Sequence, residues 1–468
     1  MPWGEPAQPV RMERVALLAP TTALRDALVQ IADTGLVELD KLSTVDAAAT
    51  APGRRLQRVV GGARVTPALA VQAPDLSALE RAGAADLLAG EAQLEERAAG
   101  AVRRSSVSAL TGWCPAHMVG SVVDRLAATG GVLVPLQRPS GVDPPSLLRR
   151  ETAVRRSFAP LVETYAIVPY ADMDPSVVAG VVYVVMFGAM FGDAGHGMLL
   201  LIVGLLLRGR QPARLARFHV AWPFVVGAAI AAIIFGVLYG EFFGPTGVLP
   251  VLWLSPVAEP VRLLLAAIGF GAVLLAGAYV LGTVNRWREG GMRSALYAPS
   301  GLAGTAVFLG FGAVVAGLYS HHNVITVLGS GLALAGLVFA GIGLFAAGGD
   351  GAAAAAEAGV GLFDLVIRLG ANVVSFARLA AFGLTHAVIA KVVWDGTTAL
   401  AGRGLGYLAV AGLVFVVGNA LAFTLEALVA AVQALRLEYY ELFSRVFDPS
   451  GRPFRPWRVP TVPEEDRT

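Results

Sequence analysis

Cysteine and charged residues are both scarce in this sequence. The 468 residues include one cysteine, Cys114, so the chain can form no internal disulfide and no cysteine-based metal cluster. We expect Cys114 to be a small buried apolar residue. Asp, Glu, Lys and Arg make up 15% of the chain, whereas soluble domains usually contain about a quarter. With 56% hydrophobic residues and a mean hydropathy of +0.65, the composition indicates an integral membrane protein.

The low net charge and the absence of known motifs argue against further classes of function. The net charge is only +2, so charge gives no argument for a nucleic-acid partner. No nucleotide-binding or nucleophile motif is found, and we expect no cofactor. The first 35 residues lack a charged start followed by an unbroken apolar core, so we expect no cleavable signal peptide.

Charge is also unevenly distributed along the chain. Most of it precedes residue 175, and no Asp, Glu, Lys or Arg occurs from Ser294 to Gly349. This shift predicts three parts: an N-terminal domain over 1–170, a membrane domain over 171–446 and a C-terminal tail over 447–468.

The N-terminal part has the pattern of an α+β domain. Thr21 and Thr22 are expected to cap its first helix and Gly35 to end it. Between two βαβ-like segments, a helical arm is expected to open at Pro74-Asp75. The expected elements are strands at 15–20, 36–39, 110–113 and 132–136, with helices at about 21–33 and 115–128.

The remainder predicts an all-α membrane domain of about eight transmembrane helices. The first two are short and the last two exceed the roughly 20 residues needed to cross a bilayer, so the last two must tilt or extend beyond it. The expected spans lie near 176–190, 194–208, 218–240, 261–285, 296–319, 324–347, 360–394 and 404–440, the last continuing as a long helix to 446.

Arginine-rich loops predict the orientation. They lie at 208–217, 286–293 and 444–458, whereas the alternate loops contain Arg403 as their one basic residue. Because positive loops stay on the cytoplasmic side, we expect a multi-pass protein of the cell membrane with both termini and the N-terminal domain in the cytoplasm.

The seventh span contains the most costly residue, Arg378. An arginine stays charged, and near the bilayer centre it costs roughly 2.5–3.5 kcal/mol on insertion scales. No acidic residue lies between Asp364 and Asp395. Arg378 therefore needs a partner elsewhere, a hydrated cavity or a moving ion. Ser375 and His386 are its polar neighbours on this span. For His386 alone, a hydrogen-bonded core histidine is an equally good interpretation.

The eighth span contains a second polar series. Glu426 and Gln433 are seven residues apart and share a helix face, and Arg436 lies about one turn further on. Such a series suits a hydrated path as well as a simple interhelical network.

The glycine-rich segment FGAMFGDAGHG (187–197) contains Asp193 and His196. This pair is a weak signal for a metal, and we assign no metal site. The glycines favour a tight turn and close helix packing. Glu241 is expected to stay wet at the end of the third span, and His321 and His322 to be solvated in a loop.

Taken together, several motifs resemble the a/I subunit family of rotary V-type and A-type ATPases, also called the 116 kDa subunit family. The motifs are PYADMDP (169–175), FGAMFGDAGHG (187–197), LYGEFFG (238–244), SFARLAAFGLTHA (375–387) and ALRLEYYELFSRVFDPSGRPFRPW (434–457). The resemblance implies that Arg378 faces a rotor carboxylate and that Arg436 is a second channel arginine. It implies a proton path through Glu426 and His386, to which Ser375 and Gln433 are added as candidates. The N-terminal domain is short for this family.

The resemblance also implies function and partners. The function would be that of a membrane stator subunit, which forms two proton half-channels and couples ion translocation to rotation without itself hydrolysing ATP. The partners would be a proteolipid rotor ring of c or K subunits, peripheral-stalk subunits of the E and G type, a central-stalk subunit of the d or C type, the lipid bilayer and, indirectly, the soluble ATPase head. The alternatives are a secondary transporter that binds an anionic substrate through Arg378, and a scaffold without transport.

Overall fold

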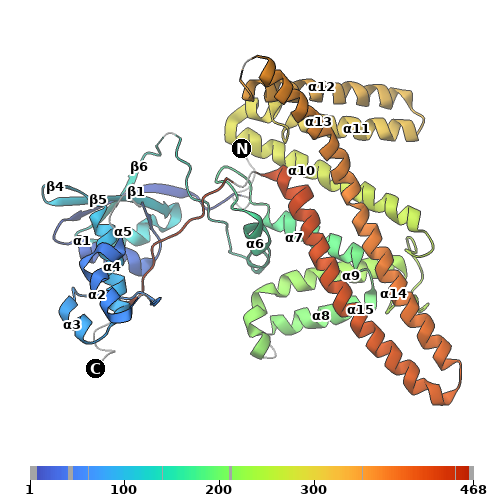
Figure 1. Cartoon of the computed structure of the whole chain (residues 1–468), viewed down its shortest axis with the longest axis horizontal. Coiled ribbons are helices and arrows are strands. Elements are labelled where there is room, and N and C mark those ends of the chain that lie inside the picture. The colour runs from blue at the N-terminus through green and yellow to red at the C-terminus, as the bar shows by residue number, and fades with distance from the viewer. Residues whose placement is uncertain are drawn as a thin grey trace. The chain divides into compact units, whose positions relative to one another are not determined.

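The computed structural model describes residues 8–40, 46–61, 63–139, 141–209, 213–349, 351–447 and 450–462. The chain forms two compact units, coloured along the sequence in Figure 1. Among the described residues, one unit contains those up to Leu148 and those from Gly451, and the other contains those within Arg149–Ser450. The division thus falls before the expected boundary at residue 170.

The first unit is a mixed α/β structure around an antiparallel sheet with strand order β2-β5-β1-β6, in which β4 also pairs with β5. Each expected βαβ segment places its two strands on either side of a strand from the other segment, which is the split βαβ arrangement. The elements are β1 (Met12–Pro20), α1 (Leu24–Thr34), β2 (Glu38–Leu39), η2 (Ala47–Ala49), α2 (Ala51–Val60), β3 (Leu69–Ala70), α3 (Leu76–Arg81), α4 (Ala85–Ala99), β4 (Val102–Arg104), β5 (Val107–Pro115), η3 (Ala116–Met118), α5 (Val119–Ala127), β6 (Val132–Leu136) and β7 (Thr461–Val462).

The sequence predicts some of the helix ends in this unit and misses others. Gly35 ends α1 with a left-handed φ of 58°, as expected. Asp75 caps α3 by accepting a hydrogen bond from the backbone N–H of Ser77 at 2.8 Å. The expected caps Thr21 and Thr22 are wrong, because α1 begins after Ala23 and no side chain caps it. The Thr21 hydroxyl instead lies 3.2 Å from that of Ser108 on β5.

The C-terminal segment is part of this unit and not a separate tail. Its strand β7 pairs in parallel with β3. Trp457 and Val459 are buried in the same core as Cys114, which has no exposed surface. An aromatic and a β-branched side chain gain several kcal/mol from such burial, which explains why the segment returns to the sheet unit.

The second unit is entirely helical. Six of its helical runs are long and apolar enough to cross a membrane, so the chain is a multi-pass membrane protein. The expected count of eight is not confirmed, because α7 and α8 have only 15 residues each. The elements are α6 (Ala153–Tyr165), α7 (Ser176–Met190), α8 (Ala194–Arg208), η4 (Ala213–Ala221), α9 (Trp222–Tyr239), α10 (Pro260–Tyr297), α11 (Leu302–Tyr319), α12 (Asn323–Ala347), α13 (Ala352–Ser375), α14 (Ala377–Ala401), η5 (Leu405–Tyr407), α15 (Leu408–Leu437), the π-helical turn η6 (Glu438–Phe443) and α16 (Ser444–Val446).

The seventh expected span is a long run interrupted at one residue. Helices α13 and α14 together cover 50 residues, about 75 Å at 1.5 Å per residue, which is far longer than a hydrocarbon layer of roughly 30 Å. Phe376 separates them and is fully buried. Its ring lies against Gly271 of α10, where an added Cβ would come within 2.2 Å of it. This close approach fixes the point where α10 crosses the run.

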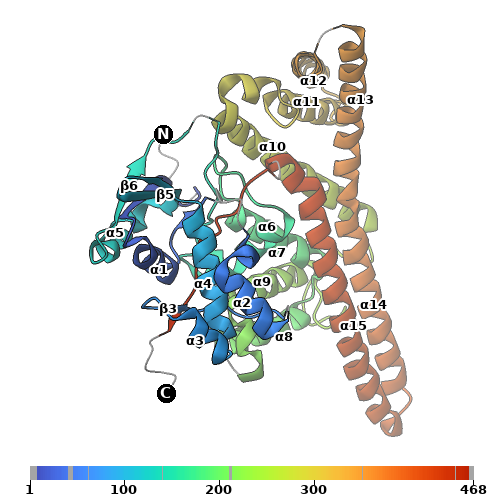
Figure 2. The ribbon, with the colours of Figure 1, turned by 60° about the vertical axis from the view of Figure 1, so that its left-hand side comes forward.

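Helices α14 and α15 form an antiparallel hairpin, whose two arms lie side by side in both views (Figures 1 and 2). Helix α7 packs against both arms. The Tyr183 hydroxyl on α7 donates a hydrogen bond to the Ala431 carbonyl oxygen on α15 at 2.9 Å. The short helix is thereby anchored at the level of the hairpin's polar residues.

We predict that Gly90→Ala destabilises the α/β unit. A Cβ at Gly90 would lie 1.9 Å from the carbonyl oxygen of Ala68, so backbone must move, at a cost of about 1–3 kcal/mol. Burial raises the pKa of the Cys114 thiol to about 12, and the native thiol should be inert. The labelling rate of Cys114 by a maleimide should therefore rise roughly tenfold or more in the variant. Gly120→Ala in α5 is the control, since nothing lies near its Cβ; equal labelling of both variants would contradict the prediction.

Candidate functional site

Arg378 lies in the first turn of α14 and is held by two contacts within this chain. Its Nε donates to the carbonyl oxygen of Ser375 at 3.1 Å, and its Nη2 donates to Oε1 of Glu441 at 2.6 Å. The side chain of Glu441 is 6% exposed and that of Arg378 is 23% exposed. The sequence offered no acidic partner nearby because Glu441 lies 63 residues further along the chain. Of the three environments that the sequence leaves open for Arg378, a partner elsewhere in the chain is therefore present.

Glu441 is carried by the π-helical turn η6 at the end of α15. Such turns widen the helix by one residue and often occur at functional sites. The ion pair leaves one atom of each partner unused. Nη1 of Arg378 and Oε2 of Glu441 are buried and have no hydrogen-bond partner among the described residues. Arg378 therefore retains a donor for a second acceptor.

His386 and Glu426 form a second polar contact between the two arms of the hairpin. Nδ1 of His386 bonds to Oε2 of Glu426. The side chain of His386 is 2% exposed and that of Glu426 is 11% exposed. Within the described part of the chain, Nε2 of the histidine and Oε1 of the glutamate have no partner. Two residues selected separately from the sequence are thus brought together.

The remaining candidates are less closely involved. Ser375 contributes its backbone carbonyl oxygen to Arg378. Gln433 is half-buried on α15 and its Oε1 has no partner among the described residues. Arg436 is exposed and makes no ion pair with any residue that the structure describes. The structure does not join Gln433 or Arg436 to either ion pair.

The turn between α7 and α8 is organised by Asp193, which is fully buried. Its carboxylate accepts three backbone N–H groups: from His196 at 2.8 Å, Phe243 at 3.0 Å and Gly244 at 2.8 Å. Close packing of the glycines is confirmed, because a Cβ at Gly188 would lie 2.6 Å from the carbonyl carbon of Ala231 and one at Gly197 would lie 2.9 Å from the backbone nitrogen of Ile233. Asp193 thus joins the α7–α8 turn to the segment that follows α9.

The expectation that the carboxylate of Glu241 is exposed to solvent is wrong. Glu241 is 4% exposed, and its Oε2 is buried without a partner among the described residues. Its carbonyl oxygen accepts a hydrogen bond from the Ala194 backbone N–H at 3.0 Å. The chain after α9 folds back over the α7–α8 turn, and this places the carboxylate inside the protein. His321 and His322 are exposed, as expected.

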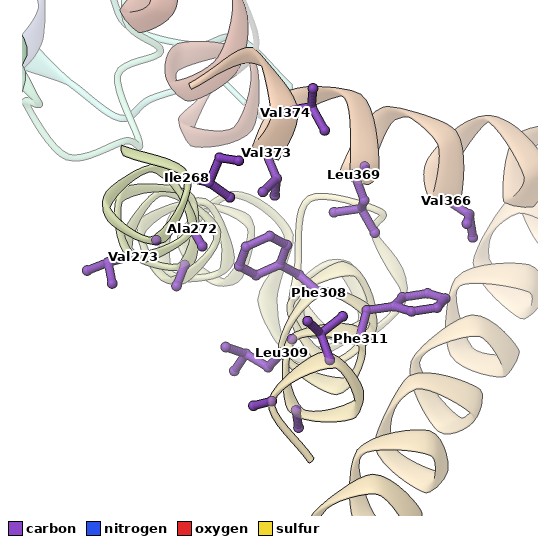
Figure 3. A pocket seen from close by; sticks show the side chains of 17 residues that line it. Ile268, Ala272, Val273, Phe308, Leu309, Phe311, Val366, Leu369, Val373 and Val374 are labelled. Atoms are coloured by element: carbon purple, nitrogen blue, oxygen red, sulfur yellow. The ribbon is translucent and has the colours of Figure 1, made fainter. Parts of the chain in front are cut away.

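A cavity of about 820 Å³ lies between α10, α11 and α13. Figure 3 shows side chains such as Ile268, Phe308 and Leu369 lining it. All of its lining residues are apolar or glycine, so it offers no group to hold an anion or carry a proton. This cavity therefore does not support the anion-transporter alternative.

Comparison with known proteins agrees with the resemblance seen in the motifs. A family model described as the V-type ATPase 116 kDa subunit family matches residues 101–246. The A-type ATP synthase subunit I of Thermococcus kodakarensis is 26% identical over 383 residues, covering 76% of this chain and 55% of that protein. Its counterpart from Aeropyrum pernix is 27% identical, covering 73% of this chain and 56% of the relative. A V-type ATP synthase subunit I 2 of Treponema pallidum is 33% identical over 144 residues, covering 29% of this chain and 32% of the relative.

The class of protein is a multi-pass membrane protein that combines an α/β unit with a helical unit, in which a helical hairpin contains polar side chains. In sequence the chain is similar to the V-type ATPase 116 kDa subunit family, whose model matches residues 101–246, and to A-type ATP synthase subunit I proteins over most of its length. It spans about half the length of the curated relatives that it matches over most of its own length.

Sequence reasoning missed Glu441, the burial of Glu241 and the approach of His386 to the α7–α8 turn. A partial signal existed for the first of these. Glu438 and Glu441 are acidic residues at the end of an apolar helix, and both are buried. An acidic pair in such a position requires partners, and Arg378 on the preceding span was one candidate beside the nearer Arg436 and Arg445.

We predict that Asp193→Ala strongly destabilises the helical unit. The substitution leaves three backbone N–H groups without their acceptor, and each such buried group costs about 1–3 kcal/mol. The thermal midpoint of helix unfolding in detergent should fall by several degrees. Asp395→Ala is the matched control, because Asp395 forms a half-exposed pair with Lys391, worth about 0.5 kcal/mol or less. Equal midpoints for the two variants would contradict a structural role for Asp193.

Proposed function

We propose that this chain is the membrane stator subunit of a rotary A-type or V-type ATPase. In this role it forms two proton half-channels and couples ion translocation to rotation of a proteolipid ring. The observation that carries the proposal is the pairing of Arg378 with Glu441 and of His386 with Glu426 inside one apolar helical hairpin. Charged groups in such surroundings are costly and mark ion pathways.

Arg378 would act on a rotor carboxylate that belongs to another chain. When protonated, that carboxylate is neutral and can face lipid, but when ionised it cannot. The guanidinium of Arg378 stabilises the ionised form by opposite charge, which drives the proton off as the carboxylate arrives. The same positive charge blocks a direct proton leak between the half-channels. The unused Nη1 of Arg378 is the donor available for this contact.

Glu441 gives Arg378 a counter-charge between encounters. A buried guanidinium without a partner would cost about 3–5 kcal/mol, and it would hold the first rotor carboxylate too tightly to release it. Exchange between Glu441 and the rotor carboxylate lowers both costs, since one negative charge replaces another. This exchange replaces the expectation that the counter-charge of Arg378 comes from the rotor alone.

The second pair lies further along the hairpin. His386 and Glu426 offer groups that take up and release protons, and Gln433 follows seven residues after Glu426 on α15. We assign them to one half-channel, and we place Arg436 at the exposed end of the path. A membrane potential of 100 mV is worth about 2.3 kcal/mol per charge. Two offset paths let that energy bias the direction of rotation.

The proposed partners follow from this role. They are the proteolipid rotor ring, peripheral-stalk subunits of the E and G type, a central-stalk subunit of the d or C type and, indirectly, the soluble ATPase head. Purification in mild detergent should recover a ring-forming proteolipid and soluble ATPase subunits with this chain, whereas an independent transporter would be purified without them.

We predict that Arg378→Ala abolishes ATP-driven proton uptake into vesicles while the complex stays assembled, because nothing then stabilises the ionised rotor carboxylate. Uptake is measured with a pH-sensitive dye, and assembly by co-purification of the ring. Arg368→Ala is the matched control on the preceding helix, since Arg368 is exposed and pairs with Asp364 at 2.7 Å. Normal coupled uptake by Arg378→Ala would refute the proposed function.

A second prediction concerns the exchange of partners. Glu441→Gln removes the charge that competes for Arg378 and keeps the side-chain size, so the rotor carboxylate should be released more slowly. The initial rate of proton uptake should fall severalfold but not to zero, whereas Arg378→Ala gives none. If Glu441→Gln matches the Arg368→Ala control, Glu441 has no part in the exchange.

A further inference from the structure

Three buried side chains converge where α14 passes the α7–α8 turn: Asp193, His196 and His386, called here the histidine cluster. One ligand atom from each lies within 4.8 Å of the others. The two imidazole rings have their centroids 5.7 Å apart and are nearly perpendicular. From the sequence, Asp193 and His196 were a weak pair without a third ligand. The fold supplies that ligand from a span almost two hundred residues later.

The cluster contains ring nitrogens without partners. His196 has no exposed surface, and neither of its ring nitrogens makes a hydrogen bond of good geometry with a described residue; its Nδ1 lies 3.8 Å from Oδ1 of Asp193, and the buried Asn419 is a further polar neighbour. Nε2 of His386 is also buried and has no hydrogen-bond partner among the described residues, and the residue is 2% exposed. Each buried unsatisfied polar group costs about 1–3 kcal/mol. Such a concentration of unused lone pairs is explained if the cluster accepts a ligand.

His386 is oriented as metal-binding histidines are. Its Nδ1 bonds to the carboxylate of Glu426. This contact fixes the tautomer that has its proton on Nδ1, so the lone pair lies on Nε2. Metal-ligating histidines almost always donate their other N–H to a carboxylate or carbonyl group in this manner.

Asp193 is equally well fixed. A carboxylate has about four lone-pair positions, and backbone N–H groups of His196, Phe243 and Gly244 occupy three of them. One position remains for a cation. The carboxylates of Asp193 and Glu426 together supply two negative charges, which offset the charge of one divalent ion in a buried site.

We propose that the histidine cluster binds one Zn²⁺ ion through Asp193, His196 and Nε2 of His386. Two imidazoles and a carboxylate are a common zinc donor set, which leaves a fourth position for water. Bond lengths of about 2.0–2.2 Å place tetrahedral ligand atoms about 3.3 Å apart. The ligand atoms must therefore close by about 1.5 Å at most, which small side-chain rotations provide.

Zinc at this position would engage His386, which the proposed function places in a proton path. Bound Zn²⁺ would then block that path and inhibit the complex. This consequence rests on the proposed function, whereas the binding site itself does not. Binding and inhibition are accordingly measured separately.

The binding experiment uses the full chain, purified in mild detergent without a polyhistidine tag and stripped with a chelator. Titration with Co²⁺ should give the visible ligand-field absorption of a four- or five-coordinate ion, and Zn²⁺ should abolish it at one ion per chain. X-ray absorption of the zinc-loaded protein should show only nitrogen and oxygen ligands, including two imidazoles. A wild-type chain that retains no Zn²⁺ after gel filtration overturns the proposal.

Variants locate the site. His196→Ala, and His196→Gln as the variant that keeps a polar side chain of similar size, should weaken Zn²⁺ binding at least a hundredfold. Glu426→Gln should weaken it about 10- to 100-fold, because it perturbs the orientation of His386. The double variant His321→Ala with His322→Ala is the control and should bind as wild type does, because both histidines are exposed in a loop. Unchanged binding by His196→Gln, or loss only in the loop variant, overturns the assignment.

Inhibition is then tested on the assembled complex. Zn²⁺ should inhibit proton uptake by the wild-type complex, and the uptake that remains in the His196→Gln complex should be insensitive to it. If Zn²⁺ binds to the cluster but leaves wild-type uptake unchanged, the site stands and the placement of His386 in the proton path fails.

Discussion

A guanidinium that cannot lose its charge must find a partner inside an apolar helical hairpin, and the arrangement around Arg378 follows from this constraint. The run of helix is interrupted at Phe376, which places Arg378 in the first turn of α14. The π-helical turn presents Glu441 to it. Gly271 lets α10 approach Phe376 closely enough to hold the interruption in place. Both departures from regular α-helix therefore lie next to the ion pair of Arg378 and Glu441.

Asp193 has a comparable role for backbone groups. By accepting three N–H bonds it ties the α7–α8 turn to the chain after α9. This connection buries Glu241 and brings His196 to within ring contact of His386. A carboxylate used in this way is structural, yet it also determines which titratable groups meet in the interior. The grouping of Glu241, His196 and His386 in the interior therefore follows from the three hydrogen bonds that Asp193 accepts at the α7–α8 turn.

The sequence predicted what depends on short-range patterns. The βαβ segments, the end of α1 at Gly35 and the opening of a helical arm at Pro74-Asp75 all follow from local composition, and all are found. Contacts between distant spans depend on the register of the hairpin, that is, on which residues of α14 face which residues of α15. Local sequence patterns do not determine this register. With His386 opposite Glu426, a regular hairpin would place Arg378 opposite Ala434 and not Glu441. Those seven residues correspond to about 10 Å of helix, so the ion pair depends on the length of the arginine side chain and on irregular helix geometry.

The polar groups of the hairpin share one further property. Four residues each bond to a partner within the chain and leave another buried atom without a partner among the described residues: Arg378, Glu441, His386 and Glu426. A network with every atom satisfied would be stable and static, because any exchange of partners would first break a bond. Half-satisfied pairs instead retain a donor or an acceptor for an incoming group. The unsatisfied atoms lower the stability of the hairpin, and in the proposed function they are the atoms that would bind and release a rotor carboxylate, a proton or a metal ion.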